Sequence, residues 1–280
     1  MQCVSKITAL REYVTEWRNA GQSIVLVPTM GNLHDGHLAL VLKAQEVADR
    51  TIVSIFVNPT QFVQGENYES YPRTLDEDID KLSGLRTDLV FHPEVEEIYT
   101  GGLQGQTCVT VPELDNILCG AFRPGHFSGV ATVVTKLFNM VEPDIAIFGE
   151  KDYQQLLVIR RLATDLCFPI KIIGVPTIRE EDGLALSSRN GYLSAKERNK
   201  APLLYKTLVS ISDAVDAGKH DFIELEMRAT ESLKNAGFKP EYVKICNADN
   251  LGKPAAGDLV VLTAAWLGKT RLIDNVIIRR

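Results

Sequence analysis

The chain has 280 residues, of which 45% are hydrophobic and 24% are charged, a composition typical of a globular protein of about two domains. Its formal net charge of −6 argues against a broad nucleic-acid surface, because binding to the phosphate backbone needs a basic face. The five cysteines have no C-x-x-C spacing, which favours reduced, mostly buried thiols. The sequence shows no signal-peptide pattern and no apolar run near ~18 residues, so we expect a soluble, cytoplasmic protein that binds no membrane.

The first 176 residues predict alternating helices and strands. Apolar residues at three- and four-residue steps, together with capping residues, predict helices over residues 4–20, 38–48, 74–85, 112–119, 130–140 and 156–166. Short apolar runs predict strands over residues 23–27, 51–57, 88–92, 107–111, 144–148 and 170–175. The strand, helix and strand within residues 23–57 form a βαβ unit. This pattern predicts a doubly wound, Rossmann-like parallel sheet over residues 1–176.

After residue 176 the pattern changes. A capping box at Ser194 begins a long predicted helix that ends near residue 216, and an amphipathic helix follows over residues 221–235. Three strands close the chain, over residues 241–245, 258–264 and 269–273. Helices followed by strands, without βαβ alternation, predict a smaller α+β domain over residues 177–280, which we expect to act as a lid.

A turn with two glycines and two histidines connects the first predicted strand to its helix, in the sequence PTMGNLHDGH over residues 28–37. The first N–H groups of a helix lack partners and carry partial positive charge, so they favour an anion. Gly31 and Gly36 remove side chains where a ligand would approach the backbone. His34 and His37 are three residues apart and can present both imidazoles as phosphate donors. The alternative is that His34 caps the helix locally and that His37 is a solvated residue at the helix start.

Further polar turns follow or precede the predicted apolar elements. Their polar residues are Asn58, Gln61, Arg123, His126, Lys151, Asp152 and Gln155. Because ligands bind open α/β sheets at the carboxyl ends of the strands, we expect these turns to converge with the histidines at one edge. Local roles are the alternatives: turn chemistry for Asn58, a solvated guanidinium for Arg123 and N-capping for Asp152.

The residue types restrict the chemistry. The expected set contains cations and histidines but no paired carboxylates for glycoside or metal chemistry, and no Ser-His-Asp or Cys-His order. The pattern G-x-G-x-x-G is absent, and Gly268-Lys269-Thr270 is not a phosphate loop because Thr263 stands where a glycine is needed. The set indicates attack on a nucleotide α-phosphate, catalysed by orientation and charge stabilisation.

Five motifs together resemble one known family. They occupy residues 28–37, 56–62, 71–73, 148–155 and 186–190. In this order they closely resemble the pantoate-beta-alanine ligase (pantothenate synthetase) family, and the resemblance extends from about residue 3 to Asn275. A single His-x-Gly-His motif is shared with class I aminoacyl-tRNA synthetases and small nucleotidyltransferases, whereas the full set is specific.

The resemblance implies a two-step ligation that uses ATP with Mg²⁺. The carboxylate of (R)-pantoate attacks the α-phosphorus, and β-alanine then attacks the pantoyl adenylate to give pantothenate and AMP. The implied catalytic residues are His34, His37, Lys151 and Arg189, with His37 handling the proton. The implied ATP-binding residues are Met30, Gly31, Asn32, Leu33, His34, Asp35, Gly36, His37, Gly149, Glu150, Lys151, Asp152, Ile178, Leu186, Ser187, Ser188 and Arg189. The implied substrate-binding residues are Met30, Asn58, Gln61, Arg123, His126, Val134 and Gln155.

Family members are typically homodimers, so the resemblance also implies a second copy of this chain as a partner. Two other functions stay open at this point. One is a nucleotidyltransferase, which would leave an adenylylated product that β-alanine does not discharge. The other is a nucleotide-binding regulatory protein, which would leave ATP unchanged after long incubation.

Overall fold

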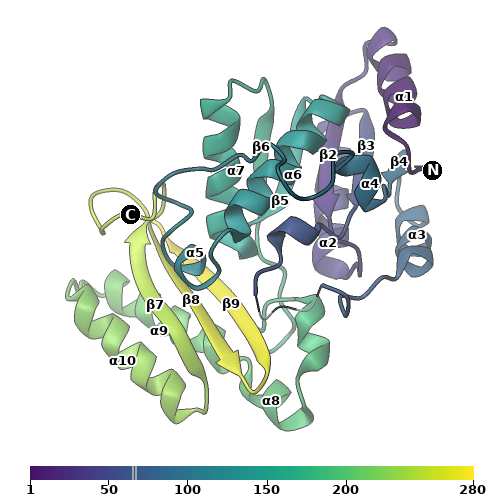
Figure 1. The fold of residues 1–280 in the computed structure, drawn as a ribbon. Helices are drawn as coiled ribbons and strands as arrows, with labels where there is room; N and C mark the ends of the chain where they lie inside the picture. Colours follow the sequence, from purple (N-terminus) through teal and green to yellow (C-terminus); the bar gives the residue numbers. More distant parts are fainter. Residues whose placement is uncertain (65, 67) are drawn as a thin grey trace. The chain divides into compact units, whose positions relative to one another are not determined.

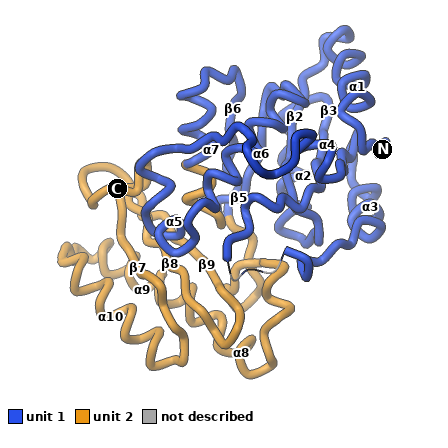
Figure 2. The backbone as a smooth tube through the Cα atoms, viewed as in Figure 1, with its two compact units in different colours: residues 1–150, 158–176 blue, residues 151–157, 177–280 orange. Residues whose placement is uncertain are grey.

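The computed structural model describes residues 1–64, 66 and 68–280. The chain forms two compact units, which Figure 2 distinguishes by colour. Unit 1 contains residues 1–150 and 158–176, and unit 2 contains residues 151–157 and 177–280. The segment 151–157 therefore belongs to unit 2, although it lies within the first 176 residues of the sequence.

Unit 1 is built around a parallel sheet (Figure 1). Among the described residues its strands are β1 (Gln2–Val4), β2 (Ile24–Thr29), β3 (Arg50–Ile55), β4 (Leu89–Phe91), β5 (Ile145–Gly149) and β6 (Lys171–Val175). Their order is β1-β4-β3-β2-β5-β6, and every pairing is parallel. The Rossmann-like fold class predicted from the sequence is confirmed. Because the winding reverses between β2 and β5, the residues that follow these two strands lie at the usual ligand-binding position.

The helices of unit 1 cover the sheet. They are α1 (Ile7–Asn19), α2 (Asp35–Val47), the 3-10 turn η1 (Pro59–Gln61), α3 (Leu75–Ser83), α4 (Val95–Ile98), α5 (Cys119–Phe122) and α6 (His126–Val141). Leu40 and Val41 of α2 pack with Val25 and Val27 of β2 in one buried cluster. The alternate residue Leu26 is also completely buried, so both faces of β2 are covered, as its continuous apolar sequence predicts.

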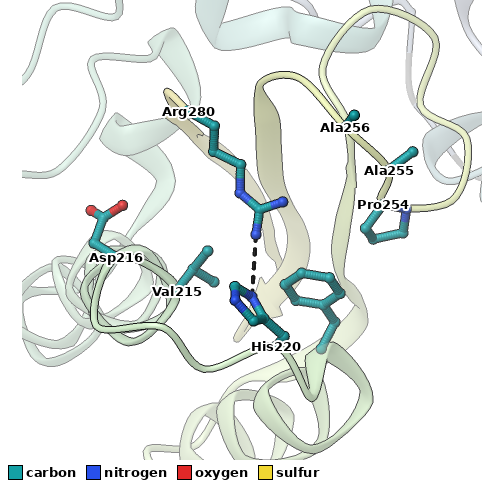
Figure 3. Close-up of a pocket in the computed structure, with 8 residues that line it drawn as sticks. Val215, Asp216, His220, Pro254, Ala255, Ala256 and Arg280 are labelled. Carbon is teal, nitrogen blue, oxygen red and sulfur yellow. Dashed lines mark hydrogen bonds between the residues drawn. The ribbon is translucent and has the colours of Figure 1, made fainter.

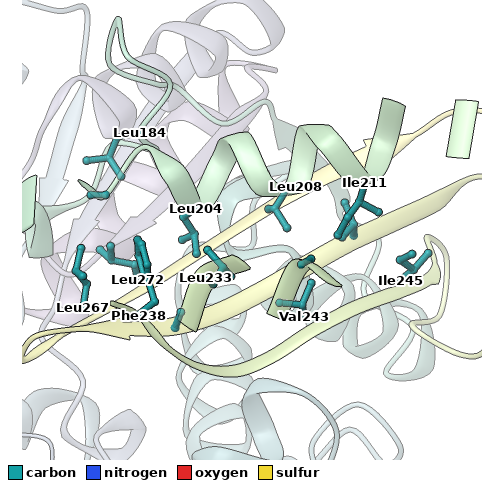
Figure 4. Packing of buried hydrophobic residues seen from close by; sticks show 14 of the residues in the cluster. Leu184, Leu204, Leu208, Ile211, Leu233, Phe238, Val243, Ile245, Leu267 and Leu272 are labelled. Atoms are coloured by element: carbon teal, nitrogen blue, oxygen red, sulfur yellow. The ribbon is translucent and has the colours of Figure 1, made fainter. Parts of the chain in front are cut away.

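Unit 2 contains an antiparallel sheet. Its residues, all of which the structure describes, form β7 (Lys239–Asn247), β8 (Leu259–Leu267) and β9 (Thr270–Ile278) in that order. The helical segments are α8 (Ala195–Lys200), α9 (Leu203–Asp216), α10 (Phe222–Asn235) and the 3-10 turn η3 (Ser188–Tyr192). Figure 4 shows Leu204, Leu208 and Ile211 of α9 pointing toward the strands. The smaller α+β unit thus has a core of its own. A short 3-10 turn η2 (Glu150–Asp152) and α7 (Tyr153–Asp165) contain residues of both units.

The prediction of one long helix over residues 194–216 is wrong. The chain forms α8 and α9 instead, and α9 begins immediately after Pro202. Proline has no N–H to donate to the carbonyl four residues earlier, and its ring collides with that carbonyl, so the first helix stops there. The capping box at Ser194 is confirmed, because Ser194 and Glu197 each accept from the backbone of the other.

Several predictions on unit 1 are also wrong. Residues 107–111 form no strand and residues 112–118 form turns and a bend, with Glu113 and Leu118 at φ of 71° and 46°, so that only Cys119 of the predicted helix is helical, as the first residue of α5. The backbone N–H of Val109 donates to Thr132 Oγ1 at 2.9 Å instead of to a strand. Thr74, at the start of the helix predicted over residues 74–85, was expected to form a capping box with Glu77; it is at the N-cap of α3 but makes no capping bond. The three-residue strand β1 was not predicted, because its residues are mostly exposed and carry no apolar pattern.

The cysteines form no disulfide anywhere in the described chain, and Cys3, Cys108 and Cys167 are exposed, so the expectation of mostly buried thiols is wrong. Burial raises the pKa of the Cys246 thiol to about 11. Within the part of the chain that the structure describes, no helix combines the length and apolarity needed to cross a membrane.

The packing of α9 on its sheet can be tested with two leucines of the same helix. Leu208 is completely buried, whereas Leu203 is 39% exposed. We expect Leu208→Ala to lower the free energy of unfolding of unit 2 by about 3 kcal/mol, because it removes buried methyl groups and leaves a cavity. Leu203→Ala should change it by less than ~1 kcal/mol. Urea unfolding followed by circular dichroism measures both, and equal effects would contradict this packing.

Candidate functional site

The histidines of the turn between β2 and α2 cap the helix reciprocally. His34 is the N-cap residue, and its Nδ1 atom accepts the N–H of Gly36 at 3.1 Å. The Nδ1 atom of His37 accepts the N–H of His34 at 3.3 Å. The ring centroids are 4.1 Å apart. Two histidines thus form the capping box that Ser and Glu usually form, and the local capping considered for His34 is present.

This cap selects the tautomer of both rings. A nitrogen that accepts a backbone N–H cannot carry a proton, so each neutral imidazole has its hydrogen on Nε2. An Nε2–H group is a hydrogen-bond donor, and both donors belong to residues at the N-terminus of a 13-residue helix. The helix dipole favours negative charge at this end. The local cap and an anion site are therefore compatible.

Asp78, a residue that the sequence analysis missed, holds the same turn from α3. Its side chain is completely buried, and its two carboxylate oxygens accept the N–H groups of Asn32 at 2.8 Å and Leu33 at 2.7 Å. The hydroxyl of Thr74 donates to the same carboxylate at 3.2 Å. Thr74 is therefore used to hold Asp78 and not to cap α3.

Gly31 is required by this arrangement. Its φ of +76° favours glycine, and a Cβ atom would lie 3.0 Å from Asp78 Oδ2 and 3.1 Å from Ile55 Cγ2. From the sequence alone, the approach of a ligand to the backbone is the expected reason for Gly31. The structure gives an additional cause, namely the approach of the buried carboxylate.

Asn58 is the N-cap of η1 and Gln61 is its last residue, shortly after the end of β3 at Ile55. Asn58 is 1% exposed, and its amide is used by local partners: its oxygen accepts from Tyr99 Oη at 2.7 Å and from Thr60, and its nitrogen donates to Gln61 Oε1 at 3.2 Å. Gln61 Nε2 lies 3.0 Å from the sulfur of Met30. The structure thus brings Met30, Asn58 and Gln61 together, with Asn58 orienting Gln61.

The predicted residues of α6 and its preceding turn support η1. His126 is 7% exposed, and its Nδ1 atom donates to the carbonyl of Gln61 at 2.7 Å, since a carbonyl can only accept. A Cβ on Gly129 would lie 2.2 Å from the carbonyl oxygen of Thr60, so α6 contacts this turn directly. Val134 is buried further along the same helix.

Arg123 is held by a carboxylate. Its guanidinium donates to both oxygens of Glu66, at 2.6 and 2.8 Å. Burial raises the pKa of the Glu66 carboxyl, but the hydrogen bonds and charge of Arg123 outweigh burial and hold the pKa below its ordinary value. The solvated role considered for Arg123 is not what the structure shows, because this side chain is only 13% exposed.

The remaining predicted residues belong mostly to unit 2. Lys151 and Asp152 are in η2, Gln155 is in α7, and Gly149 and Glu150 end the unit 1 segment. Residues 178–186 form a hairpin in which the N–H of Leu186 donates to the carbonyl of Ile178 at 2.9 Å. Ser187 caps η3 by accepting the N–H of Arg189 at 3.2 Å, so Ser187, Ser188 and Arg189 form one short ordered segment.

A hollow of about 450 Å³ in unit 2 is separate from these residues (Figure 3). It is lined by Val215, Asp216, His220, Phe222, Pro254, Ala255, Ala256 and Arg280. Arg280 Nη2 lies 3.3 Å from His220 Nδ1. None of the predicted site residues lines this hollow. Across residues 1–64, 66 and 68–280, no group of three or more His, Cys, Asp or Glu side chains is placed to hold a metal ion.

The comparisons with known proteins agree with one another. A family model described as Pantoate-beta-alanine ligase matches residues 2–277. A protein from Azotobacter vinelandii named pantothenate synthetase is 56% identical over 99% of this chain and 98% of its own length. The crystal structure of the Thermus thermophilus enzyme of the same name covers 100% of both chains with 44% identity and a TM-score of 0.93. A pantoate-beta-alanine ligase from Francisella tularensis, complexed with Beta-gamma ATP and beta-alanine, covers 99% of this chain and 97% of its own, with 36% identity and a TM-score of 0.82.

The support that Asp78 gives to the turn can be measured directly. We expect Asp78→Ala to lower the free energy of unfolding by about 3 kcal/mol, because it leaves two buried N–H donors without an acceptor. Hydrogen exchange at the amides of Asn32 and Leu33 should accelerate in the same variant. Asp76→Ala, an exposed change in the first turn of the same helix, is the matched control. Unchanged exchange at both amides in Asp78→Ala would rule out this role.

Proposed function

Since the chain belongs to the pantoate-beta-alanine ligase family, we propose that it carries out the reaction of that family. One set of its side chains would bind the phosphates of ATP, and a second set would bind the small acid. The reaction condenses (R)-pantoate with β-alanine at the expense of ATP and gives pantothenate, a coenzyme A precursor, with AMP and pyrophosphate. It proceeds through pantoyl adenylate. The observation that carries the assignment of residues is the reciprocal cap of His34 and His37.

In the first step a carboxylate oxygen of pantoate forms a bond to the α-phosphorus, and the bond from that phosphorus to pyrophosphate breaks. In the second step the amine of β-alanine forms a bond to the acyl carbon, AMP leaves, and the nitrogen loses a proton. Neither step needs a covalent bond to the protein. Orientation of the reactants and stabilisation of the phosphate charge are sufficient sources of catalysis.

We assign the charge stabilisation to His34, His37, Lys151 and Arg189. The cap leaves the proton of each neutral histidine on Nε2, so each ring can donate to a phosphate oxygen without first changing its protonation. His37 would hold its Nε2 proton against the oxygen that gains charge when pyrophosphate leaves. Ser187 and Ser188 would donate to the phosphates from η3, and Gly149 and Asp152 would hold the ribose.

The small acid is assigned to the residues around η1. Gln61 would donate to pantoate, and its contact with Met30 places an apolar side chain beside that amide. Met30 and Val134 would line the pocket for the gem-dimethyl group, with Gln155 as a second amide. Asn58, Arg123 and His126, assigned to the substrate by the resemblance, are engaged with Gln61, Glu66 and the backbone, and we propose that they shape this pocket.

Mg²⁺ is proposed to enter as part of the substrate MgATP. The described residues offer no cluster of metal ligands, and both oxygens of Asp78 already accept backbone N–H groups. Mg²⁺ commonly keeps several waters and binds through substrate phosphates, which fits this side-chain set.

We also propose a cytoplasmic compartment, because the reaction consumes ATP and because Cys3, Cys108 and Cys167 are free, exposed thiols, which a reducing compartment preserves.

A homodimer and a lid role for residues 177–280 are proposed from the family resemblance. Light scattering should give about twice the chain mass of 31.0 kDa for the dimer.

Product analysis with single omissions tests the function. With ATP, Mg²⁺, pantoate and β-alanine we expect pantothenate, AMP and pyrophosphate in equal amounts. Omission of pantoate should abolish pyrophosphate release. A stable adenylylated product that β-alanine does not discharge would favour a nucleotidyltransferase, and unchanged ATP would favour a regulatory binding protein.

The role of His37 can be separated from its cap by two substitutions. His37→Asn retains an oxygen where Nδ1 accepts the cap bond but removes the Nε2 donor, and we expect adenylate formation to fall by roughly 10²-fold or more. His37→Gln places an amide donor near Nε2 and should lose less activity. His220→Ala, in the hollow of Figure 3, is the matched control and should keep the parent rate. Parent-like adenylate formation by His37→Asn would remove His37 from the mechanism.

A further inference from the structure

Two adjacent buried polar residues of β9, Asp274 and Asn275, are unexplained by the roles assigned so far. They are 3% and 6% exposed. Burial of a charge or an amide is costly unless hydrogen bonds replace those made with water. Their partners therefore indicate what these residues are for.

Asp274 binds one arginine of the hairpin formed by residues 178–186. Its oxygens accept from Arg179 Nη1 at 2.7 Å and from Nη2 at 2.9 Å. The same guanidinium donates to the carbonyl of Gly183 at 3.1 Å and lies 3.6 Å from the centre of the Tyr205 ring. Burial raises the pKa of the Asp274 carboxyl, and the charges of Arg179 and Lys151 oppose this shift. A buried ion pair contributes little net stability compared with apolar residues of the same size, so stability alone does not explain it.

The hairpin that Arg179 holds leads directly into the segment Ser187–Arg189. The N–H of Glu180 donates to the carbonyl of Leu184 at 2.8 Å, which closes the turn beside Arg179. Asn190 Nδ2 donates to the carbonyl of Ala185 at 3.0 Å and ties the far end of the segment back to the hairpin. A displacement of Arg179 would therefore move the residues that precede and follow Ser187.

Asn275 binds the second phosphate-holding segment of unit 2. Its Nδ2 atom donates to the carbonyl of Lys151 at 3.0 Å. The backbone of Asn275 also accepts from Arg179 Nη2 at 3.2 Å. Two neighbouring residues of one strand thus hold the Lys151 backbone and the arginine of the hairpin. β9 itself is paired with β8 over its whole length, which makes it a rigid support.

We propose that Asp274 and Asn275 are positioning residues for the ATP site. Together they fix Lys151 and the segment Ser187–Arg189 relative to each other. The proposal rests on the phosphate-binding roles assigned above. It predicts that half of the nucleotide site is assembled within unit 2 before ATP arrives, so that little ordering is needed on binding.

Substitution of Asn275 tests the contact with Lys151. We expect Asn275→Ala to weaken ATP binding and to raise the KM for ATP by about tenfold, since the hydrogen bond that fixes the Lys151 backbone is lost. Asn275→Asp keeps the shape of the side chain but replaces the donor with an acceptor, so we expect it to raise the KM for ATP at least as much. It serves as the test if Asn275→Ala folds poorly. Asn247→Ala is the matched control, because Asn247 is a buried asparagine of β7 in the same sheet. Among the hydrogen bonds resolved for its side chain, the oxygen accepts only the N–H of Asp249.

A double-mutant cycle separates positioning from stability. If Asn275 acts through Lys151, Lys151→Ala with Asn275→Ala should bind ATP no more weakly than Lys151→Ala alone. The same cycle should show coupling between Asp274→Asn and Arg189→Ala. Glu241→Gln, which breaks the Glu241–Arg271 ion pair of the same sheet, is the control and should be additive with both.

Calorimetric ATP affinity, kinetic constants and thermal midpoints are measured for every variant. Additive effects on ATP affinity, or an equal loss in Asn247→Ala and Asn275→Ala, would overturn the proposal. Because ATP affinity is measured without turnover, a parent protein that binds ATP but releases no pyrophosphate with pantoate refutes the proposed function, while the cycle still decides the role of β9.

Discussion

The hydrogen bonds from backbone N–H groups to the two Nδ1 atoms are the constraint on which the turn between β2 and α2 depends. They use the Nδ1 atom of each imidazole, orient both rings and leave the proton of each neutral ring on Nε2. A helix cap made of Ser and Glu would satisfy the same N–H groups without supplying an imidazole N–H donor. In the proposed function, each of His34 and His37 would therefore perform a structural task through Nδ1 and a chemical task through Nε2.

A buried carboxylate and a buried amide hold other parts of unit 1 in the same way. Asp78 holds the N–H groups of Asn32 and Leu33, and Asn58 orients Gln61. Each of these groups is almost fully removed from water, so its hydrogen bonds do not compete with solvent. Residues that would contact substrate are then held in place before it binds. Preorganisation of this kind is the usual source of electrostatic stabilisation in enzymes.

The sequence predicts those parts of the molecule that depend on periodic or local patterns. Apolar runs identified β2, β3 and β5, and the glycine- and histidine-containing turn lies between β2 and α2, where the sequence predicts it. Asp78 could not be distinguished from Asp76 in the same way, because both are acidic residues in the first turn of one helix. Only the tertiary contact with the turn makes Asp78 buried. The strand β1 was missed for a related reason, since it pairs with β4, whose residues Leu89–Phe91 are far along the chain.

Residues that position other residues were the least visible in the sequence. Asp274 and Asn275 lie in β9 but beyond the strand predicted over residues 269–273, and nothing local marks them as different from surface polar residues. Their partners, Arg179 and Lys151, are 95 and 124 positions earlier in the chain. A motif records the groups that face the ligand, whereas the supporting groups are defined by contacts that close only in the folded chain. The histidine turn is therefore visible in the sequence, whereas the supporting contacts of Asp274 and Asn275 are visible only in the folded chain.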